Sequence, residues 1–438
     1  MTTMTVIGCG YLGAVHAACM ATLGHDVLGI DVDAGKVEQL NNGIPPFFEP
    51  GFPELLAEAL KSNRLRFSSD ISEAAGRTVH FVCVGTPQKR NEYAADLAYV
   101  DAAVNALAPH LSPGAIVVGK STVPVGTATR LADIVTDAQP TAMLAWNPEF
   151  LREGLAVQDT LHPDRIVYGL PDGEAGETAK ALLDEVYENA LAGGTPLVVT
   201  DYATAELVKA AANSFLATKI SFINAMAEVC EASGADVTKL ADAIGHDPRI
   251  GRRFLNAGLG FGGGCLPKDI RAFMARAGEL GADQALAFLR EIDSINMRRR
   301  VRMVDLAREF FGGSIVGRRI AVLGLAFKPN SDDIRDSPAL NVAAQMKLQG
   351  ASVVVTDPQA VANAQKAWPD LEYAESPQAA ATGADLVMVL TEWDEYRWLN
   401  PAEFGTIVRG KRILDGRNAL DREAWRAAGW QYRALGRR

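Results

Sequence analysis

The sequence predicts an α/β protein with two Rossmann-like, doubly wound domains joined by a long central helix. Three observations lead to this prediction. A strand–helix–strand pattern with a glycine-rich turn occupies residues 4–33, and a similar alternation returns at residues 317–358. Between them, residues 201–233 contain neither proline nor glycine and are rich in good helix formers. We therefore expect domains at residues 1–200, 201–300 and 301–438.

Composition and charge exclude several classes of protein. The 438 residues are 48% hydrophobic and 22% charged, which is typical of a globular protein in water. The net charge of −10 argues against nucleic acid as a partner. The sequence has no run of 18 apolar residues, so we expect no membrane span. The N-terminus also lacks the basic region that is typical of a signal peptide. Five cysteines without CxxC spacing favour reduced thiols in a cytoplasmic protein, with no structural metal or disulfide framework.

The first strand–helix–strand unit carries a dinucleotide-binding fingerprint, Gly8-x-Gly10-x-x-Gly13. In this motif the first glycine makes the tight turn, the second lets the pyrophosphate approach, and the third allows close packing of helix on strand. The helix N-terminus offers backbone N–H groups to the phosphates. Asp31 ends the second strand, where a carboxylate accepts from a ribose 2′-hydroxyl and repels a 2′-phosphate. The pattern therefore predicts NAD rather than NADP as the cofactor.

Polar residues follow the later strands of this domain, at the edge where ligands bind in open α/β sheets. They are Thr86, Ser121, Thr122 and Glu149. The segment 147–154 also has helix-start chemistry, with Asn147 as N-cap and Pro148 at the first position. On such a helix Glu149 and Glu153 would share one face. The alternative is that both are merely exposed acids favoured by the helix dipole.

The central region holds two further candidates. Lys209 and Asn213 are four residues apart on the long predicted helix and so share a face; the alternative is a solvated lysine stripe. Cys265 ends a run of three glycines and precedes a predicted helix with Pro267 in its first turn. A helix N-terminus and the nearby Lys268 would both favour the thiolate, and Asp269 lies one turn further on. The alternative is a small buried residue, which we expect for the other four cysteines.

The second Rossmann-like half lacks the phosphate glycines. Its first turn has a single glycine, Gly324, followed by Lys328. We expect it to hold a different ligand, with Lys328, Arg335 and Arg417 as candidate cations. The alternative is a structural repeat without a ligand.

Taken together, the motifs resemble one family over nearly the whole chain. They are "GCGYLG" (8–13), "VGTP" (84–87), "STVPVGT" (121–127), "NPEFLREG" (147–154), "AELVKAAANSFLATKISFIN" (205–224), "DPRIGRRFL" (247–255), "FGGGCLPKD" (261–269), "LGLAFKPNSDDIRDSP" (323–338) and "DGRN" (415–418). This set resembles the nucleotide-sugar 6-dehydrogenases, the UDP-glucose-oxidising members more closely than the GDP-mannose-oxidising ones. One departure is Gly264, where the family usually has serine.

The resemblance implies an NAD-binding first domain, a central helix that dimerises, and a third domain that binds a UDP-sugar. It also implies oxidation of the sugar C6 alcohol to a carboxylate with two NAD and one water. Cys265 matches the nucleophile, and the other implied catalytic residues are Thr122, Glu149, Lys209, Asn213 and Asp269. The implied cofactor-binding residues are Gly8, Gly10, Tyr11, Leu12, Gly13, Asp31, Lys36, Thr86, Ser121, Thr122, Glu153, Lys268 and Arg335. The implied substrate-binding residues are Phe150, Leu151, Glu153, Lys209, Asn213, Arg249, Phe254, Gly262, Phe327, Lys328 and Arg417, with Arg249 reaching the substrate of a neighbouring subunit.

Two alternatives come from outside this family. A 3-hydroxyacid dehydrogenase shares the first domain and the long helix, but needs neither the cysteine loop nor a second Rossmann-like half. A non-catalytic nucleotide-sugar-binding protein would lack the nucleophile or the glycine fingerprint, and both are present in the sequence.

Overall fold

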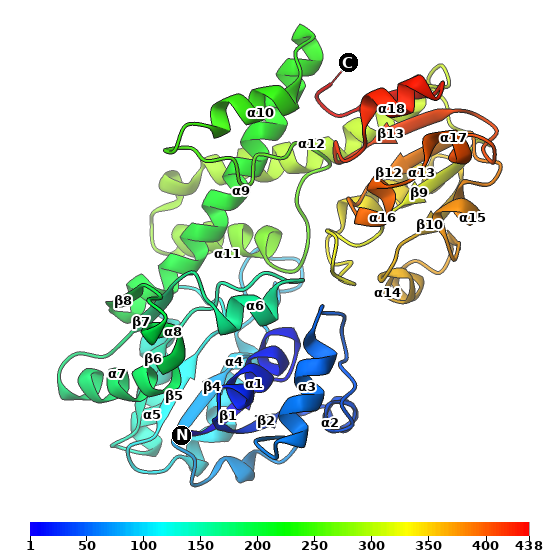
Figure 1. Ribbon diagram of the computed structural model, residues 1–438. Helices are drawn as coiled ribbons and strands as arrows, with labels where there is room; N and C mark the ends of the chain where they lie inside the picture. The colour runs from blue at the N-terminus through cyan, green and yellow to red at the C-terminus, as the bar shows by residue number, and fades with distance from the viewer. Residues whose placement is uncertain (438) are drawn as a thin grey trace. The chain divides into compact units, whose positions relative to one another are not determined.

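The computed structural model describes residues 1–437 and divides the chain into two compact units (Figure 1). The first unit comprises residues 1–212 with 271–281, and the second comprises residues 213–270 with 282–438. In the described residues each unit is built on one sheet.

An eight-stranded sheet forms the centre of the first unit, in the order β3-β2-β1-β4-β5-β6-β7-β8. Strands β1 to β6 are parallel, β7 pairs antiparallel with β6, and β8 is parallel to β7. The order of the first six strands is that of a dinucleotide-binding Rossmann domain, as the sequence predicts. The strands span Thr3–Ile7 (β1), Asp26–Ile30 (β2), Leu65–Ser68 (β3), Val79–Val82 (β4), Ile116–Gly119 (β5), Met143–Trp146 (β6), Ile166–Gly169 (β7) and Leu197–Thr200 (β8).

Helices cover both faces of this sheet. One apolar core joins the strands to α1, α3, α6 and α7, and a second joins them to α4 and α5. The parallel strands are buried on both sides, which explains their continuous apolar runs. The helices span Tyr11–Thr22 (α1), Ala34–Asn41 (α2), Phe52–Lys61 (α3), Ala98–Leu107 (α4), Thr127–Ala138 (α5), Ala156–Leu161 (α6), Glu174–Val186 (α7) and Glu188–Ala192 (α8).

The β1–α1 turn takes the shape that its glycines predict. Gly8 has φ +91°, a left-handed conformation that favours glycine. A Cβ on Gly13 would lie 1.9 Å from the carbonyl oxygen of Gly8, so only glycine lets α1 approach the strand this closely. Helix α1 ends at Thr22, and Gly24 with φ +100° turns the chain into β2.

Helix α9 spans Tyr202–Ser233 and confirms the long proline-free and glycine-free helix. It begins in the first unit and continues into the second. Within the first unit, the buried Glu206 of α9 accepts hydrogen bonds from the backbone N–H groups of Gly126 (2.7 Å) and Ala128 (2.7 Å). This carboxylate therefore caps the start of α5, which lacks a side-chain cap of its own.

The second unit is built on a six-stranded sheet in which all strands are parallel, in the order β11-β10-β9-β12-β13-β14. The order repeats the Rossmann pattern and confirms the second doubly wound half. The strands span Arg319–Leu323 (β9), Ser352–Thr356 (β10), Glu372–Tyr373 (β11), Leu386–Val389 (β12), Arg412–Asp415 (β13) and Gln431–Ala434 (β14). The remaining helices span Val237–Gly245 (α10), Leu266–Glu279 (α11), Phe288–Glu309 (α12), Pro338–Leu348 (α13), Val361–Ala367 (α14), Pro377–Ala381 (α15), Asp394–Arg397 (α16), Pro401–Phe404 (α17) and Arg422–Ala427 (α18).

The expected helix at residues 147–154 is wrong. The segment has no regular secondary structure, and the next helix, α6, begins only at Ala156. Asn147 does not cap a helix, because its side-chain oxygen accepts from Lys120 Nζ (2.9 Å) and from the Tyr187 hydroxyl (2.6 Å). Glu149 and Glu153 are therefore loop residues rather than neighbours on a helix face.

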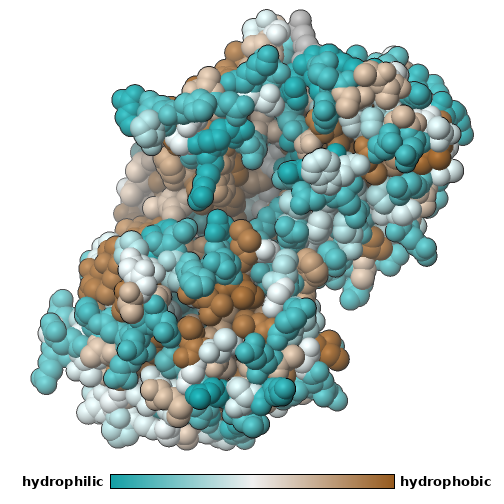
Figure 2. All heavy atoms as spheres, viewed as in Figure 1, coloured by the Kyte–Doolittle hydropathy of each residue, from teal (hydrophilic) through white to brown (hydrophobic). Residues whose placement is uncertain are grey.

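Figure 2 shows hydrophilic side chains interspersed with neutral and hydrophobic ones over the face in view. No helix within residues 1–437 is both long and apolar enough to cross a membrane.

Candidate active site

Two hydroxyls join the loops that follow β4 and β5. The Thr86 hydroxyl donates to the carbonyl oxygen of Thr122 (2.8 Å), and the Ser121 hydroxyl donates to that of Val84 (2.7 Å). Thr86 and Ser121 are buried. The structure thus brings three of the predicted residues together at the carboxyl edge of the sheet, and two of their hydroxyls hold the backbone of that edge.

The glycine turn fits the pyrophosphate of a dinucleotide. Helix α1 begins at Tyr11, and no side chain caps its N-terminus at Gly10. A Cβ on Gly10 would meet no atom within 4 Å, so the protein leaves space beside these backbone N–H groups. An uncapped helix N-terminus with open space in front of it suits a phosphate group. The pyrophosphate would be held by the turn residues Gly8, Gly10, Tyr11, Leu12 and Gly13.

The Asp31 carboxylate is buried and already holds three hydrogen bonds. Its Oδ2 accepts from the backbone N–H of Cys9 (2.8 Å) and from Lys36 Nζ (2.9 Å), while its Oδ1 accepts from the N–H of Asp33 (3.0 Å). Two predicted cofactor residues, Asp31 and Lys36, are therefore an ion pair. A ribose hydroxyl would meet a carboxylate that is fixed in orientation.

Glu149 and Lys209 form the second pair of predicted residues in this unit. Lys209 Nζ lies 3.1 Å from Glu149 Oε1, and both side chains are largely buried, with 7% and 14% exposed. The other Glu149 oxygen accepts the backbone N–H of Leu151 (2.7 Å). Two cations lie near the ring of Phe150: the Arg165 guanidinium carbon is 3.7 Å and Lys209 Nζ is 5.6 Å from its centroid. The loop after β6 therefore interacts with both cations.

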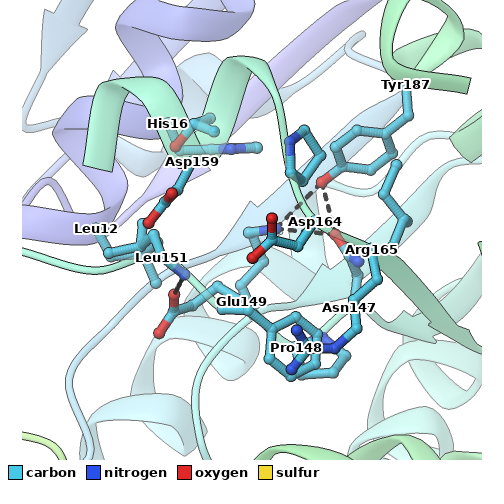
Figure 3. A pocket seen from close by; sticks show the side chains of 15 residues that line it. Leu12, His16, Asn147, Pro148, Glu149, Leu151, Asp159, Asp164, Arg165 and Tyr187 are labelled. Carbon is cyan, nitrogen blue, oxygen red and sulfur yellow. Dashed lines mark hydrogen bonds between the residues drawn. The ribbon is translucent and has the colours of Figure 1, made fainter. Parts of the chain in front are cut away.

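A pocket of about 60 Å³ opens beside this loop (Figure 3). Pro148, Glu149 and Phe150 line it together with the buried side chains of His16, Lys120 and Tyr187. Tyr187 and Asn147 point toward one another there, joined by a hydrogen bond.

The third group of predicted residues lies in the second unit, around the cysteine loop. Cys265 directly precedes α11, and its carbonyl accepts the N–H of Asp269 (2.9 Å), which confirms its position at the helix N-terminus. It is the exposed cysteine of the five, whereas the other four are buried, as expected. The buried Asp269 carboxylate accepts from Asn213 (2.6 Å) and from Lys268 Nζ (2.6 Å).

The glycines of this loop are needed because residues 327–338 pack directly against it. The Gly263 N–H donates to the Arg335 carbonyl oxygen (2.8 Å). A Cβ on Gly262 would lie 2.4 Å from the Asp336 carbonyl oxygen, and one on Gly263 would lie 2.8 Å from the Phe327 ring. The guanidinium of Arg335 lies against Gly264 and pairs with Asp333 (2.7 Å). The cysteine loop is therefore fixed by the C-terminal Rossmann-like half.

The remaining predicted substrate residues differ in their surroundings. Arg417 donates to the carbonyl oxygens of Leu390 (3.0 Å) and Gly260 (2.9 Å), so it also braces the loop backbone. Lys328 Nζ lies 5.3 Å above the Phe327 ring. Arg249 has an 87% exposed side chain paired with Asp247.

Sequence reasoning missed three charged residues that shape the site. Glu49 is buried and accepts the N–H groups of Gly154 (2.6 Å) and Ala156 (2.7 Å) as well as the Tyr11 hydroxyl. Glu206 caps α5, and Lys120 lies beside the pocket. For Lys120 a signal exists in the sequence, since it is a single charge at the end of the apolar strand run 115–119.

A Rossmann domain with an open phosphate turn, a second Rossmann-like half without one, and a thiol exposed at a helix N-terminus define an NAD-dependent oxidoreductase with a second nucleotide-binding domain. Residues 2–191, 203–298 and 321–422 match, in this order, the NAD binding, central and UDP binding domains of the UDP-glucose/GDP-mannose dehydrogenase family. The chain belongs to this family, and NAD is its cofactor.

Similar proteins match along the whole chain. A UDP-glucose 6-dehydrogenase of Rhizobium meliloti is 42% identical over 437 residues, which cover 99% of each chain. A UDP-glucose 6-dehydrogenase of Bacillus subtilis is 39% identical and covers 99% of this chain and 98% of its own. Among solved structures, a UDP-glucose dehydrogenase from the hyperthermophilic archaeon Pyrobaculum islandicum superimposes with a TM-score of 0.91 at 39% identity, covering 100% of this chain and 98% of the other.

Proposed function

We propose that the protein oxidises the C6 alcohol of UDP-glucose to a carboxylate, giving UDP-glucuronate with the use of two NAD and one water. The substrate rests on the full-length similarity to proteins named UDP-glucose 6-dehydrogenase. The chemistry rests on one observation above all, the exposed Cys265 at the start of α11. A helix N-terminus favours the thiolate, which is the nucleophile that a second oxidation at the same carbon needs.

NAD, when bound, accepts the hydride in each of the two oxidations. In the first, the C6 hydroxyl loses its proton while C6 loses a hydride, and an aldehyde results. The proton goes either to a water held by Asp269 and Thr122 or to Lys209, once Lys209 has passed a proton of its own to its partner Glu149. Lys209 already has a carboxylate within hydrogen-bond distance, Glu149, to which a proton can pass on.

In the second oxidation the Cys265 thiolate adds to the aldehyde carbon, and the carbonyl oxygen takes a proton from Lys209 to become a hydroxyl. This thiohemiacetal loses a hydride from C6 and returns the hydroxyl proton to Lys209, which leaves a thioester. Oxyanions form on the way to each species. Lys209 and Asn213, one turn apart on α9, are the donors that we assign to them.

Hydrolysis releases the product. A water attacks the thioester carbon, Glu149 takes the proton of that water, and the bond between C6 and sulfur breaks to return the Cys265 thiolate. Glu149 is suited to its role because Lys209 and the Leu151 N–H fix both of its oxygens.

The remaining predicted site residues belong to the same proposal. We assign Thr86, Ser121, Glu153, Lys268 and Arg335 to NAD binding, in addition to the glycine turn, Asp31 and Lys36. We assign the UDP-sugar contacts to Phe150, Leu151, Arg249, Phe254, Gly262, Phe327, Lys328 and Arg417.

We further propose that the protein is a cytoplasmic homodimer. Phe215, Phe222 and Val229 recur every seven residues on α9, which places them on one helix face, and they are 66%, 47% and 57% exposed. Such a stripe of large apolar side chains is typical of a buried interface. A Phe215→Glu, Phe222→Glu variant should sediment as a monomer; a wild-type protein that sediments as a monomer would overturn the dimer.

Five free thiols are consistent with the cytoplasm.

The function is tested by NADH formation from a panel of nucleotide sugars. We expect two NADH per UDP-glucose and little turnover with GDP-mannose. One NADH per sugar would overturn the thioester mechanism. Turnover of GDP-mannose alone would overturn the choice of sugar, and no NADH with any nucleotide sugar would overturn the proposed activity.

A further inference from the structure

Lys120 is a buried cation that the proposed chemistry does not use. It follows directly after β5, and its side chain is 6% exposed. No carboxylate among residues 1–437 forms an ion pair with it. Burying an ammonium group without a counter-charge is costly, so a residue that did no more than fill this space would be better replaced by an apolar one.

The ammonium group is instead held by two neutral oxygens and two aromatic rings. Lys120 Nζ lies 2.9 Å from Asn147 Oδ1 and 3.1 Å from the Tyr187 hydroxyl. The rings of Phe81 and Tyr187 have their centroids 5.6 and 5.7 Å away. Tyr187 donates in turn to the same Asn147 oxygen (2.6 Å), so that oxygen receives two donors (Figure 3).

These bonds fix the end of the loop that carries Glu149. The Asn147 side-chain N–H group donates to the Val167 carbonyl oxygen (2.9 Å), and its backbone N–H donates to that of Gly119 (2.8 Å). The side-chain oxygen, the side-chain N–H group and the backbone N–H of Asn147 therefore all form hydrogen bonds, which fix its orientation. Glu149 follows only two residues later in an irregular segment, so this anchor fixes the backbone that leads into Glu149, while Lys209 and the Leu151 N–H hold its carboxylate.

Lys120 also joins two loops of the site. It directly precedes Ser121 and Thr122 in the loop after β5, and through Asn147 it holds the loop after β6. The two loops carry Thr122 and Glu149, which the proposed function assigns to the first and last proton transfers. Lys120, Glu149 and Phe150 all line the pocket of Figure 3.

We infer that Lys120 is a positioning residue for Glu149, acting through Asn147 and Tyr187 to hold the loops after β5 and β6 in one arrangement. The inference rests on the proposed function, because it deepens the role of Glu149 in that reaction. Lys120 touches neither sugar nor cofactor in this scheme.

The charge of Lys120 makes the anchor sensitive to pH. Burial lowers the pKa of Lys120 from 10.5 to about 8, although the nearby Cys83 and Glu149 oppose this shift and Lys209 adds to it. The ammonium form therefore predominates at neutral pH and is lost above about pH 8. The titratable groups that face it are those of His16, Cys83, Glu149, Tyr187 and Lys209. Burial and the Lys120 charge keep the pKa of His16 well below its usual value, so His16 stays neutral throughout.

The test compares Lys120→Met with the wild-type protein in the NADH assay with UDP-glucose. Methionine is unbranched and only one atom shorter than lysine, and it removes the charge. We expect kcat to fall on the order of 100-fold, as when a reacting group is misplaced by about 1 Å, with little change in the KM for NAD. The melting temperature should change little, because removal of the cost of burying the charge offsets the loss of the hydrogen bonds to Asn147 and Tyr187. Lys180→Met, which removes a half-exposed lysine of α7, is the matched control and should leave kcat unchanged.

The pH profile separates positioning from packing. Wild-type kcat should fall above about pH 8 toward the level of Lys120→Met, and this alkaline limb should be absent from the variant. Tyr187→Phe removes one acceptor of the ammonium group and should move the limb to lower pH, which keeps the test valid if Lys120→Met folds poorly. An unchanged kcat in Lys120→Met, or an alkaline limb that persists in it, would overturn the inference. The wild-type protein is assayed first. If it forms no NADH with UDP-glucose, the proposed function is overturned, and this outcome is distinct from any difference between the variants.

Discussion

Arg335 lies so close to Gly264 that a Cβ on the glycine would be 2.3 Å from the guanidinium carbon. Gly264 directly precedes the candidate nucleophile, at the position where the resemblance leads us to expect serine. The two features belong together, because a side chain at residue 264 and the observed Arg335 rotamer exclude each other. Glycine at residue 264 therefore leaves room for the guanidinium, where the resemblance leads us to expect a hydroxymethyl group.

Gly264→Ser should displace Arg335 from the cysteine loop and break its pair with Asp333 (2.7 Å). We expect kcat/KM to fall by about tenfold, or about 1.4 kcal/mol in the barrier. Gly278→Ser is the control, since a Cβ there meets no atom within 4 Å. The double variant Gly264→Ser, Arg335→Ala removes the clash, so its loss should be smaller than the sum of the two single losses. Additive losses would show that the close approach has no effect on the reaction.

Asp31 should make the enzyme select NAD over NADP. Its carboxylate is held rigidly by Cys9, Asp33 and Lys36, so it cannot turn away from a 2′-phosphate. We expect kcat/KM to be lower for NADP by about 100-fold, or about 2.7 kcal/mol. Asp31→Asn keeps the shape and releases Lys36 as a partner for phosphate, so the ratio should shrink. Asp33→Asn, at an exposed helix cap, should leave it unchanged. Equal kcat/KM values of the wild-type protein for NAD and NADP would show that Asp31 does not distinguish a ribose 2′-hydroxyl from a 2′-phosphate.

The elements that the sequence predicts correctly are those whose pattern is local. The glycine turn, the apolar strands and the 32-residue helix α9 each follow from periodicity or from backbone geometry within one segment. The strand order also follows, because doubly wound folds allow few alternatives. The fold class was therefore open to prediction from the residues alone.

What the sequence could not reveal depends on distant partners. Residues 147–154 read as a helix start, and only Lys120 and Tyr187, which lie 27 and 40 residues away, take the Asn147 side chain out of that role. The contact between Arg335 and Gly264 also could not be predicted, because no sequence pattern near either residue indicates that the two meet in the fold. Tertiary hydrogen bonds override local propensity at such positions.

Glu206 should make stability depend on pH. Burial raises its pKa from 4.5 to about 7, and the N–H groups of Ala128 and Gly126 only partly oppose this. The pKa of Glu206 is higher in the folded protein than in the unfolded chain. Its contribution to the free energy of unfolding is therefore full below about pH 4.5 and is lost as the pH rises through about 7. This group alone then weakens folding by about 3 kcal/mol between those limits.

The Glu206→Gln variant tests this, because glutamine cannot ionise. Urea unfolding at about pH 5 and about pH 7.5 should show a smaller drop in stability for the variant than for the wild-type protein. Glu58→Gln, at an exposed position of α3, is the control and should follow the wild-type protein. Parallel pH dependences of Glu206→Gln and wild type would contradict the prediction.

Cys265 is the residue on which the proposed reaction depends most. Replacement by serine keeps the size of the side chain and removes most of its nucleophilicity. An ester formed on serine would also be released slowly, because an alkoxide is a poorer leaving group than a thiolate. Cys265→Ser should therefore lose steady-state turnover by several orders of magnitude, about the scale seen when a nucleophile is removed.

The two variants of Cys265 separate the two oxidations. Cys265→Ser incubated with UDP-glucose and NAD should accumulate a covalent sugar adduct, which intact-protein mass spectrometry detects. Cys265→Ala should form no adduct and should at most carry out the first, reversible hydride transfer. Replacement of the buried Cys230 by alanine is the control and should leave turnover near the wild-type level. If Cys265→Ala keeps more than about a tenth of wild-type turnover, a change of only about 1.4 kcal/mol in the barrier, then the sulfur of Cys265 does not form the bond to C6, and the glycine loop serves only to join α11 to the C-terminal half.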